Sequence, residues 1–155
     1  MLVNRKDRDI LRELANQIAE IAALPVQQET IALWKAINAL KPVRPMVMIE
    51  QIPWHEMDVN GELTLQTEDP VCRGIETGLR RKLYSWNHMR ADMVIEPVID
   101  IGKAIRGTDF GVRTVEKTAV RDPKNSVVGH YYFDQLKTDE DLEKIKNPEV
   151  VLDEE

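Results

Sequence analysis

The sequence lacks several features by which a protein is often assigned to a class. Its 155 residues include a single cysteine, Cys72, which cannot form an internal disulfide and cannot by itself make a zinc site. No apolar run approaches the roughly 18 residues of a membrane span. The N-terminus also lacks the apolar stretch and cleavage site of a signal peptide. We therefore expect a cytoplasmic protein with no membrane contact.

Positive charge is also in short supply. The chain has 27 acidic and 21 basic residues, which gives a formal net charge of −6. The imbalance lies in residues 138–155, which hold eight acidic and two basic residues. The one basic cluster, residues 80–82 (RRK), falls in a predicted helix, where we expect it to form a solvated face. Because phosphate contacts need clustered lysine and arginine, the composition argues against nucleic acid as a partner.

Four segments have the patterns of helices. Apolar residues recur every three or four positions over about 4–23, 27–40 and 70–89, the spacing of an amphipathic helix. The third begins with Asp69 and Pro70, an N-cap residue followed by the residue favoured at the first helical position. Thr138 and Asp141 resemble a capping box and predict a short helix over 139–146.

Two apolar runs, residues 45–50 and 93–100, flank the predicted helix 70–89. Short continuous apolar runs are typical of strands buried on both faces. A strand, a helix and a second such strand predict a parallel βαβ unit with a right-handed crossover. Residues 62–66 alternate as a short half-buried strand does, and residues 112–120 and 126–133 are expected to pair as a hairpin around a turn at 121–125. The predicted fold class is therefore α/β.

The candidate site residues follow the two predicted parallel strands, because ligands of parallel α/β folds lie outside the carboxyl ends of the strands. A histidine between carboxylates can act as an acid, a base or a ligand anchor. The alternative is structural: Glu50 and Glu96 bond backbone amides or arginines, and Trp54 packs over the helix. The candidates for substrate binding are Glu50, Trp54, His55, Glu56, Glu96 and Asp100.

No other residue forms a strong motif. The sequence contains no P-loop, GxGxxG, GxSxG, HExxH or CxxC pattern, and it predicts no metal site. We expect His88 to be a surface or boundary residue and His130 to belong to an apolar strand face. Cys72 falls in the first turn of a helix, where the dipole can lower the pKa of a thiol, but a packed structural role is favoured.

Four segments, taken in order, resemble the N-terminal part of the uroporphyrinogen decarboxylase family, which includes cobalamin-dependent methyltransferases. They cover about two thirds of the chain. The segments are RPMVMI at 44–49, the Asp69-Pro70 helix start, ADMVIEPVID at 91–100 and LKTDEDLEKIKNP at 136–148.

The family fold is a (β/α)8 barrel, which needs about 250 residues. The resemblance therefore implies that residues 43–155 are the N-terminal portion of such a TIM barrel and that residues 1–42 form an added N-terminal helical arm. The segment that holds substrate carboxylates in the decarboxylase is rich in arginine, whereas residues 50–56 (EQIPWHE) contain none. The decarboxylase's second-strand aspartate falls at Ile99, one residue before Asp100. The chain thus resembles the methyltransferase branch more closely.

The resemblance implies methyl transfer between a corrinoid and a methylated small molecule, with this chain supplying part of the active-site rim. The zinc ligands of that branch, a His-x-Cys and a later Cys, have no match here, so no cofactor is expected in this chain. Zinc and a corrinoid would belong to the full-length protein. The expected partners are a small-molecule substrate, a corrinoid protein, and the missing C-terminal half or a second copy. Alone, the chain is not expected to be active. The alternatives are a non-catalytic interaction module and an inactive truncated reading frame.

Overall fold

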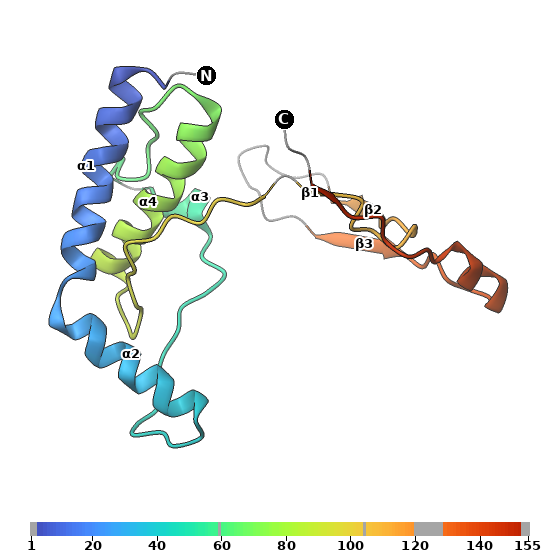
Figure 1. Cartoon of the computed structure of the whole chain (residues 1–155), viewed down its shortest axis with the longest axis horizontal. Coiled ribbons are helices and arrows are strands. Elements are labelled where there is room, and N and C mark those ends of the chain that lie inside the picture. The colour runs from blue at the N-terminus through green and yellow to red at the C-terminus, as the bar shows by residue number, and fades with distance from the viewer. Residues whose placement is uncertain (1–2, 59, 104, 120–128, 153–155) are drawn as a thin grey trace. The chain divides into compact units, whose positions relative to one another are not determined.

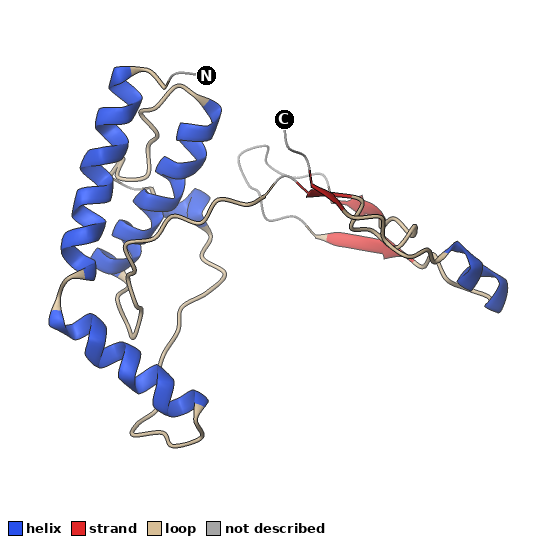
Figure 2. Cartoon of the chain, viewed as in Figure 1, coloured by secondary structure: helices blue, strands red, loops and turns tan. Residues whose placement is uncertain are grey.

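Figure 1 shows the computed structural model, which describes residues 3–58, 60–103, 105–119 and 129–152. The chain divides into two compact units, residues 1–99 and residues 100–155. The first unit is helical and the second contains the strands, as the colours of Figure 2 show. The described residues are therefore of mixed helix and strand, and none of their helices is long and apolar enough to cross a membrane.

The first unit is built on two long helices, α1 (Arg5–Ala22) and α4 (Pro70–His88), which lie side by side (Figure 1). Both match the predicted segments 4–23 and 70–89. Their facing apolar stripes supply most of a small core, because residues three and four apart share one face of a helix. The buried core residues are Leu14, Ile18, Leu79, Trp86 and Ile95.

Side chains cap both helices as their sequences predict. Asn4 precedes α1 and accepts a hydrogen bond from the backbone N–H of Asp7 at 2.7 Å. Asp69 precedes α4 and accepts from the N–H groups of Val71 and Cys72, while Pro70 occupies the first helical position. These caps satisfy N–H groups that have no partner inside the helix. The predicted helix 27–40 is α2 (Pro25–Asn38), and α3 (Trp54–Met57) is a single turn.

The predicted strand at 62–66 is wrong. This segment is a loop, because two carboxylates take the backbone N–H groups that a strand ladder would use. Glu76 of α4 accepts from the N–H groups of Gln66 and Thr67 at 2.9–3.0 Å, and Asp58 accepts from Leu63 at 3.0 Å. Asp7 of α1 holds the next two N–H groups, those of Glu68 and Asp69.

The predicted parallel strands at 45–50 and 93–100 also fail to form. Neither segment belongs to a ladder in the described structure. Among the described residues, the one backbone hydrogen bond near both runs goes from the N–H of Asp92, just before the second run, to the carbonyl of Val47 in the first, at 3.2 Å. Ile95 is buried, whereas most other apolar side chains of these runs are exposed. A strand buried on both faces needs covering layers and neighbouring strands, which the described residues do not supply.

The second unit contains two separate pairs of short antiparallel strands. Strand β2 (Val115–Thr118) pairs with β3 (His130–Phe133), which confirms the predicted hairpin. The turn predicted at 121–125 lies outside the described residues. Strand β1 (Ile105–Arg106) pairs with β4 (Val151–Leu152). No barrel is formed by the strands that the structure describes.

The segment after β1 continues beside the segment before β4. The N–H of Lys146 donates to the carbonyl of Phe110 at 2.7 Å, and Gly107 and Gly111 lie against the carbonyls of Glu149 and Lys144. Both glycines have positive φ, +73° and +83°, a conformation that L side chains rarely adopt. The acidic C-terminal region is thus paired with residues 105–111. Its helix, η1 (Asp139–Lys144), is a 3₁₀ helix that begins with the predicted capping box of Thr138 and Asp141.

Candidate functional site

The single-turn helix α3 carries three of the predicted site residues and packs against α4. Trp54 meets the ring of Tyr84 edge-on, with 6.2 Å between ring centroids, and the guanidinium of Arg81 lies 5.1 Å from the centroid of the Trp54 ring. The Tyr84 hydroxyl donates to the carbonyl of Met57 at 2.9 Å. Tyr84 thus fixes both ends of α3 on α4. This is the structural alternative that the sequence left open for Trp54.

The histidines of this unit each lie beside a glutamate. His55 Nε2 is 3.2 Å from a carboxylate oxygen of Glu56, its neighbour in α3. His88, at the end of α4, is exposed as expected and lies 3.0 Å from Glu62. Its ring also contacts Tyr84, with 4.3 Å between centroids. A histidine beside a carboxylate can hold or transfer a proton, so His55 with Glu56 is the one predicted acid–base pair that the described residues contain.

The basic cluster of α4 contacts loops instead of forming only a solvated face. Arg80 is largely buried and donates to the Glu76 carboxylate at 2.7 Å and to the carbonyl of Glu62 at 2.9 Å. Lys82 donates to the carbonyl of Val98 at 2.9 Å. The expectation of a solvated face is therefore wrong for Arg80, because the buried Glu76 carboxylate requires a cation within reach.

Asp92, just before the second apolar run, forms hydrogen bonds with three residues from other segments of the first unit. Its carboxylate binds the guanidinium of Arg44 through both oxygens, at 2.5 and 3.0 Å, and accepts from the N–H of Val47 at 2.8 Å. Its carbonyl accepts from the indole N–H of Trp34 at 2.8 Å. The bond from Arg44, followed by the bond from Val47, lowers the pKa of Asp92 to about 2. Asp92 therefore stays ionised at neutral pH and joins α2 to both runs.

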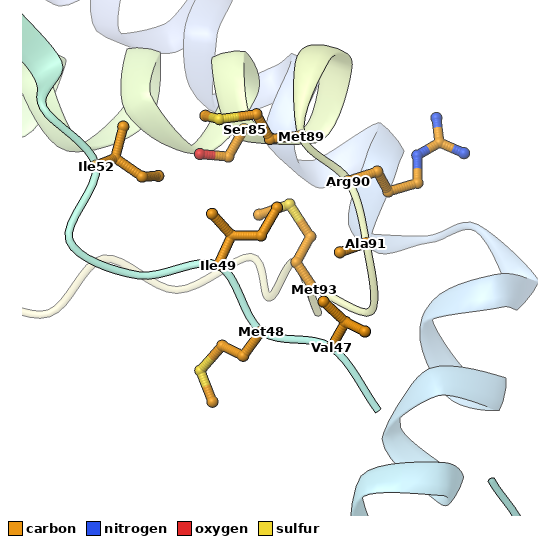
Figure 3. A pocket seen from close by; sticks show the side chains of 9 residues that line it. All are labelled: Val47, Met48, Ile49, Ile52, Ser85, Met89, Arg90, Ala91 and Met93. Carbon is orange, nitrogen blue, oxygen red and sulfur yellow. The ribbon is translucent and has the colours of Figure 1, made fainter. Parts of the chain in front are cut away.

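A small apolar cavity lies between the two runs and the end of α4 (Figure 3). Val47 and Ile49 from the first run and Met93 from the second run extend toward it, as Figure 3 shows. Its volume is about 80 Å³, whereas pockets for small-molecule ligands usually measure roughly 300–1,000 Å³. The cavity is thus too small for a cofactor or a drug-sized substrate.

The remaining predicted residues do not converge with α3 in the described structure. Glu50, at the end of the first run, and Glu96, in the middle of the second, are exposed, and neither has a hydrogen bond or an ion pair with another described residue. The expected alternative, bonds to backbone amides or arginines, is therefore not found for them. Asp100 is exposed and begins the second unit. The carboxylates of Glu50 and Glu96 are accessible to a ligand, but their positions do not indicate which kind of ligand would bind.

No group of three or more metal-ligating side chains is close enough to hold a metal ion in the part of the chain that the structure describes. Cys72 is 2% exposed. Its burial, together with the negative charge of Asp69, raises the pKa of its thiol, so Cys72 is neither an accessible nucleophile nor a ready metal ligand. This agrees with the packed role that the sequence favours.

Sequence patterns alone missed the residues that organise this region: Tyr84, Arg81, Glu76 and the Arg44–Asp92 pair. Tyr84 occupies an ordinary helical position, and its partners lie about 30 residues earlier in the chain. A signal did exist for the pair, because Arg44 opens the family-like segment 44–49 and Asp92 is the second residue of the family-like segment 91–100. An ion pair between Arg44 and Asp92 could be predicted only if the two segments lie side by side, and the predicted βαβ unit implied that they do.

Compared with known proteins, the chain matches no family model, no curated protein and no solved structure.

Proposed function

We propose that the chain is the N-terminal part of an enzyme similar to the uroporphyrinogen decarboxylase family, of the methyltransferase-like branch. In this proposal the two apolar runs become the first two strands of a (β/α)8 barrel when the remaining strands are present. Residues at the ends of these runs then line part of the rim of a small-molecule site, where a corrinoid and a methylated substrate exchange a methyl group.

The observation that carries the proposal is the ion pair between Arg44 and Asp92. These residues lie at the beginnings of the two segments that resemble the first and second barrel strands, Arg44 as the first residue of 44–49 and Asp92 as the second of 91–100, and they are 48 positions apart. The same carboxylate accepts the N–H of Val47, and the N–H of Asp92 donates to Val47 in return. The two runs are thus held together near their N-terminal ends, in the order of the family's first two barrel strands. Two strands that are to pair in parallel must be joined in this way.

The positions of the carboxylates support the choice of site residues. Glu50 and Glu96 follow the Val47–Asp92 contact by three and four residues respectively, so they fall at similar heights if the runs continue in parallel. Both are exposed and unpaired among the described residues. Trp54 and His55 follow on α3. A rim of this kind can bind a cationic or hydrogen-bonding substrate.

The described residues do not fit a zinc ion, because no group of them has the ligand number that zinc requires. In this proposal any zinc and the corrinoid are held by other parts of the full-length protein. This chain binds the substrate through its carboxylates and one aromatic side chain.

The test is reconstitution with the sequence encoded downstream of codon 155, in the same frame or the adjacent one. The product is mixed with cob(I)alamin and methylammonium, a methylated cation, and transfer of the methyl group to cobalt with release of ammonia is followed by the absorbance of the corrinoid. We expect methylcobalamin to form, with KM for methylammonium raised about tenfold by Glu96→Gln, the effect of one lost charge-assisted hydrogen bond. Glu20→Gln, at an exposed position on α1, is the matched control. A stop without further βα units nearby, or no methyl transfer, would contradict the proposal.

The second candidate is a non-catalytic interaction module. The exposed apolar side chains of the first run favour it, since contiguous exposed apolar surface commonly marks a binding site. In that case residues 1–155 bind a partner, and variants at Glu96 leave its function unchanged. A full-length product that transfers methyl groups would exclude this candidate as the main function.

A further inference from the structure

We propose that two copies of this chain associate through residues 44–50, which pair antiparallel about a two-fold axis at Val47. This inference concerns self-association of the 155-residue chain and does not rest on the proposed function, in which further barrel strands would take the same edge. Below, the first run is taken together with Arg44, which precedes it, as residues 44–50.

The first run has the composition of a strand and the exposure of an unpaired edge. Its central five residues, 45–49, carry no charge, and they include no turn or bend. The exposed fractions are 55% for Val47, 63% for Met48 and 46% for Ile49. An apolar strand edge with unpaired backbone N–H and C=O groups is a template for pairing with another chain. In the monomer these apolar side chains remain exposed to water, which is unfavourable.

The hydrogen bonds at Asp92 show which backbone groups remain available. Both the N–H and the C=O of Val47 are used on the side of Asp92. In an extended chain, successive residues turn these groups to opposite edges. The groups of Met46 and Met48 then face the open edge, and no hydrogen bond reaches them in the described structure. Pro45, which lacks an N–H, falls on the inner edge, where it does not interrupt pairing.

One register matches charge as well as apolar surface. An antiparallel pair centred on Val47 places Met46 opposite Met48 of the second copy, and Arg44 opposite Glu50 of the second copy. Opposite charges that face each other across strands stabilise a pair. Arg44 has five N–H donors, and its bonds to Asp92 and Pro45 use three of them. It can therefore bind Asp92 and a second carboxylate together, while Glu50 has no partner of its own among the described residues.

Charge reversal at Glu50 tests the register. The full chain is examined by analytical ultracentrifugation over a range of protein concentrations. Two seven-residue segments form a smaller contact than the roughly 1,200–2,000 Å² of stable interfaces, so we expect a dimer that dissociates on dilution. Glu50→Lys should raise its dissociation constant about tenfold or more. Glu96→Lys makes the same charge change at another exposed position and should leave the constant unchanged. A chain that remains monomeric at high concentration overturns the proposal.

A cysteine at the axis tests the geometry directly. In the proposed register, Val47 faces Val47 of the second copy as a non-hydrogen-bonded pair, with Cα atoms about 4.5 Å apart, within the range that a disulfide spans. Mild oxidation should therefore cross-link Val47→Cys, and much less Met46→Cys, because that residue faces position 48. The unaltered chain has only the buried Cys72 and should not cross-link. Dimers that form without cross-linking Val47→Cys, or that cross-link both variants equally, overturn antiparallel pairing at this edge.

Discussion

Three acidic residues connect segments of the first unit that are far apart in sequence. Asp7 joins α1 to the loop before α4, Glu76 joins α4 to the same loop, and Asp92 joins the two apolar runs. Asp7 and Glu76 are fully buried. Each carboxylate accepts several backbone N–H groups, which favours its ionised form. The bonds from Asp69 and Glu68 outweigh the burial of Asp7 and lower its pKa.

Glu76 gives a prediction for acid stability. Burial is the largest single influence and favours the neutral acid, but bonds from Thr67, Gln66 and Arg80 together outweigh it and bring the pKa to about 2. The unfolded chain has its pKa near 4.5, so this contribution to folding is complete above that pH and is lost as the pH falls toward 2. Glu76→Gln should lower the free energy of unfolding by about 1–3 kcal/mol at neutral pH. Glutamine keeps one acceptor oxygen, but it turns an NH2 group toward donors that the second carboxylate oxygen accepted from, and it leaves Arg80 without its counter-charge.

Urea unfolding of the variant and the unaltered chain, measured at several pH values, checks this prediction. The difference between the two should shrink as the pH falls from about 4.5 to about 2. Glu20→Gln, an exposed substitution on α1, should change neither the stability nor its pH dependence. A Glu76→Gln difference that stays constant over this range would show that the charge of Glu76 is not the cause.

The candidate site was only partly predictable at the level of single residues. From the sequence, Trp54 is a candidate for substrate binding, with packing over the helix as the alternative, and the structure shows this packing. The sequence could not identify Tyr84 or Glu76, whose roles depend on contacts 10 to 30 residues away. A carboxylate that caps a distant loop has the same local sequence as one in solvent.

Among the elements of the fold, the helices were predictable and most strands were not. The starts of α4 and η1 follow from local pairs, Asp69 with Pro70 and Thr138 with Asp141. The runs at 45–50 and 93–100 have strand composition, yet pairing depends on neighbours that composition does not specify. The hairpin of β2 and β3 was predicted correctly because its two strands are close in sequence.

The pairing of residues 105–111 with the C-terminal segment depends on two glycines. An alanine at Gly107 or Gly111 would adopt positive φ, and its Cβ would meet the Glu149 carbonyl at Gly107 or the Lys144 carbonyl, 2.7 Å away, at Gly111. We expect each substitution to weaken this pairing by about 1–3 kcal/mol. The N–H of Lys146, which donates to Phe110, should then exchange with solvent about tenfold faster or more in NMR experiments.

Gly102→Ala is the matched control for this prediction. Gly102 lies in the same unit, has no positive φ, and has open space where a Cβ would be. Its substitution should leave the exchange of the Lys146 N–H unchanged. Equal rates in Gly102→Ala and Gly111→Ala would mean that the close approach at Gly111 does not hold the C-terminal segment.

For the whole molecule, the two units differ in what stabilises them. The first unit has a buried apolar core between α1 and α4. In the second unit no described residue is buried, and Tyr131, Tyr132 and Val115 on the hairpin are 65%, 60% and 48% exposed. Units of fewer than about 60 residues that bury little apolar surface have only marginal folding stability. An isolated two-stranded hairpin is also only marginally stable in water.

We therefore expect hydrogen exchange of the unaltered chain to separate the units. Backbone N–H groups of α1 and α4 should be protected by most of the free energy of unfolding, because opening them exposes the core. Those of β2, β3 and η1 should be protected far less, because opening them exposes no core. Mass spectrometry of peptides from residues 5–22, 70–88 and 129–144 gives the comparison. Similar protection in all three would mean that the second unit gains a cover in solution, and its exposed aromatic face would be the surface to examine for it.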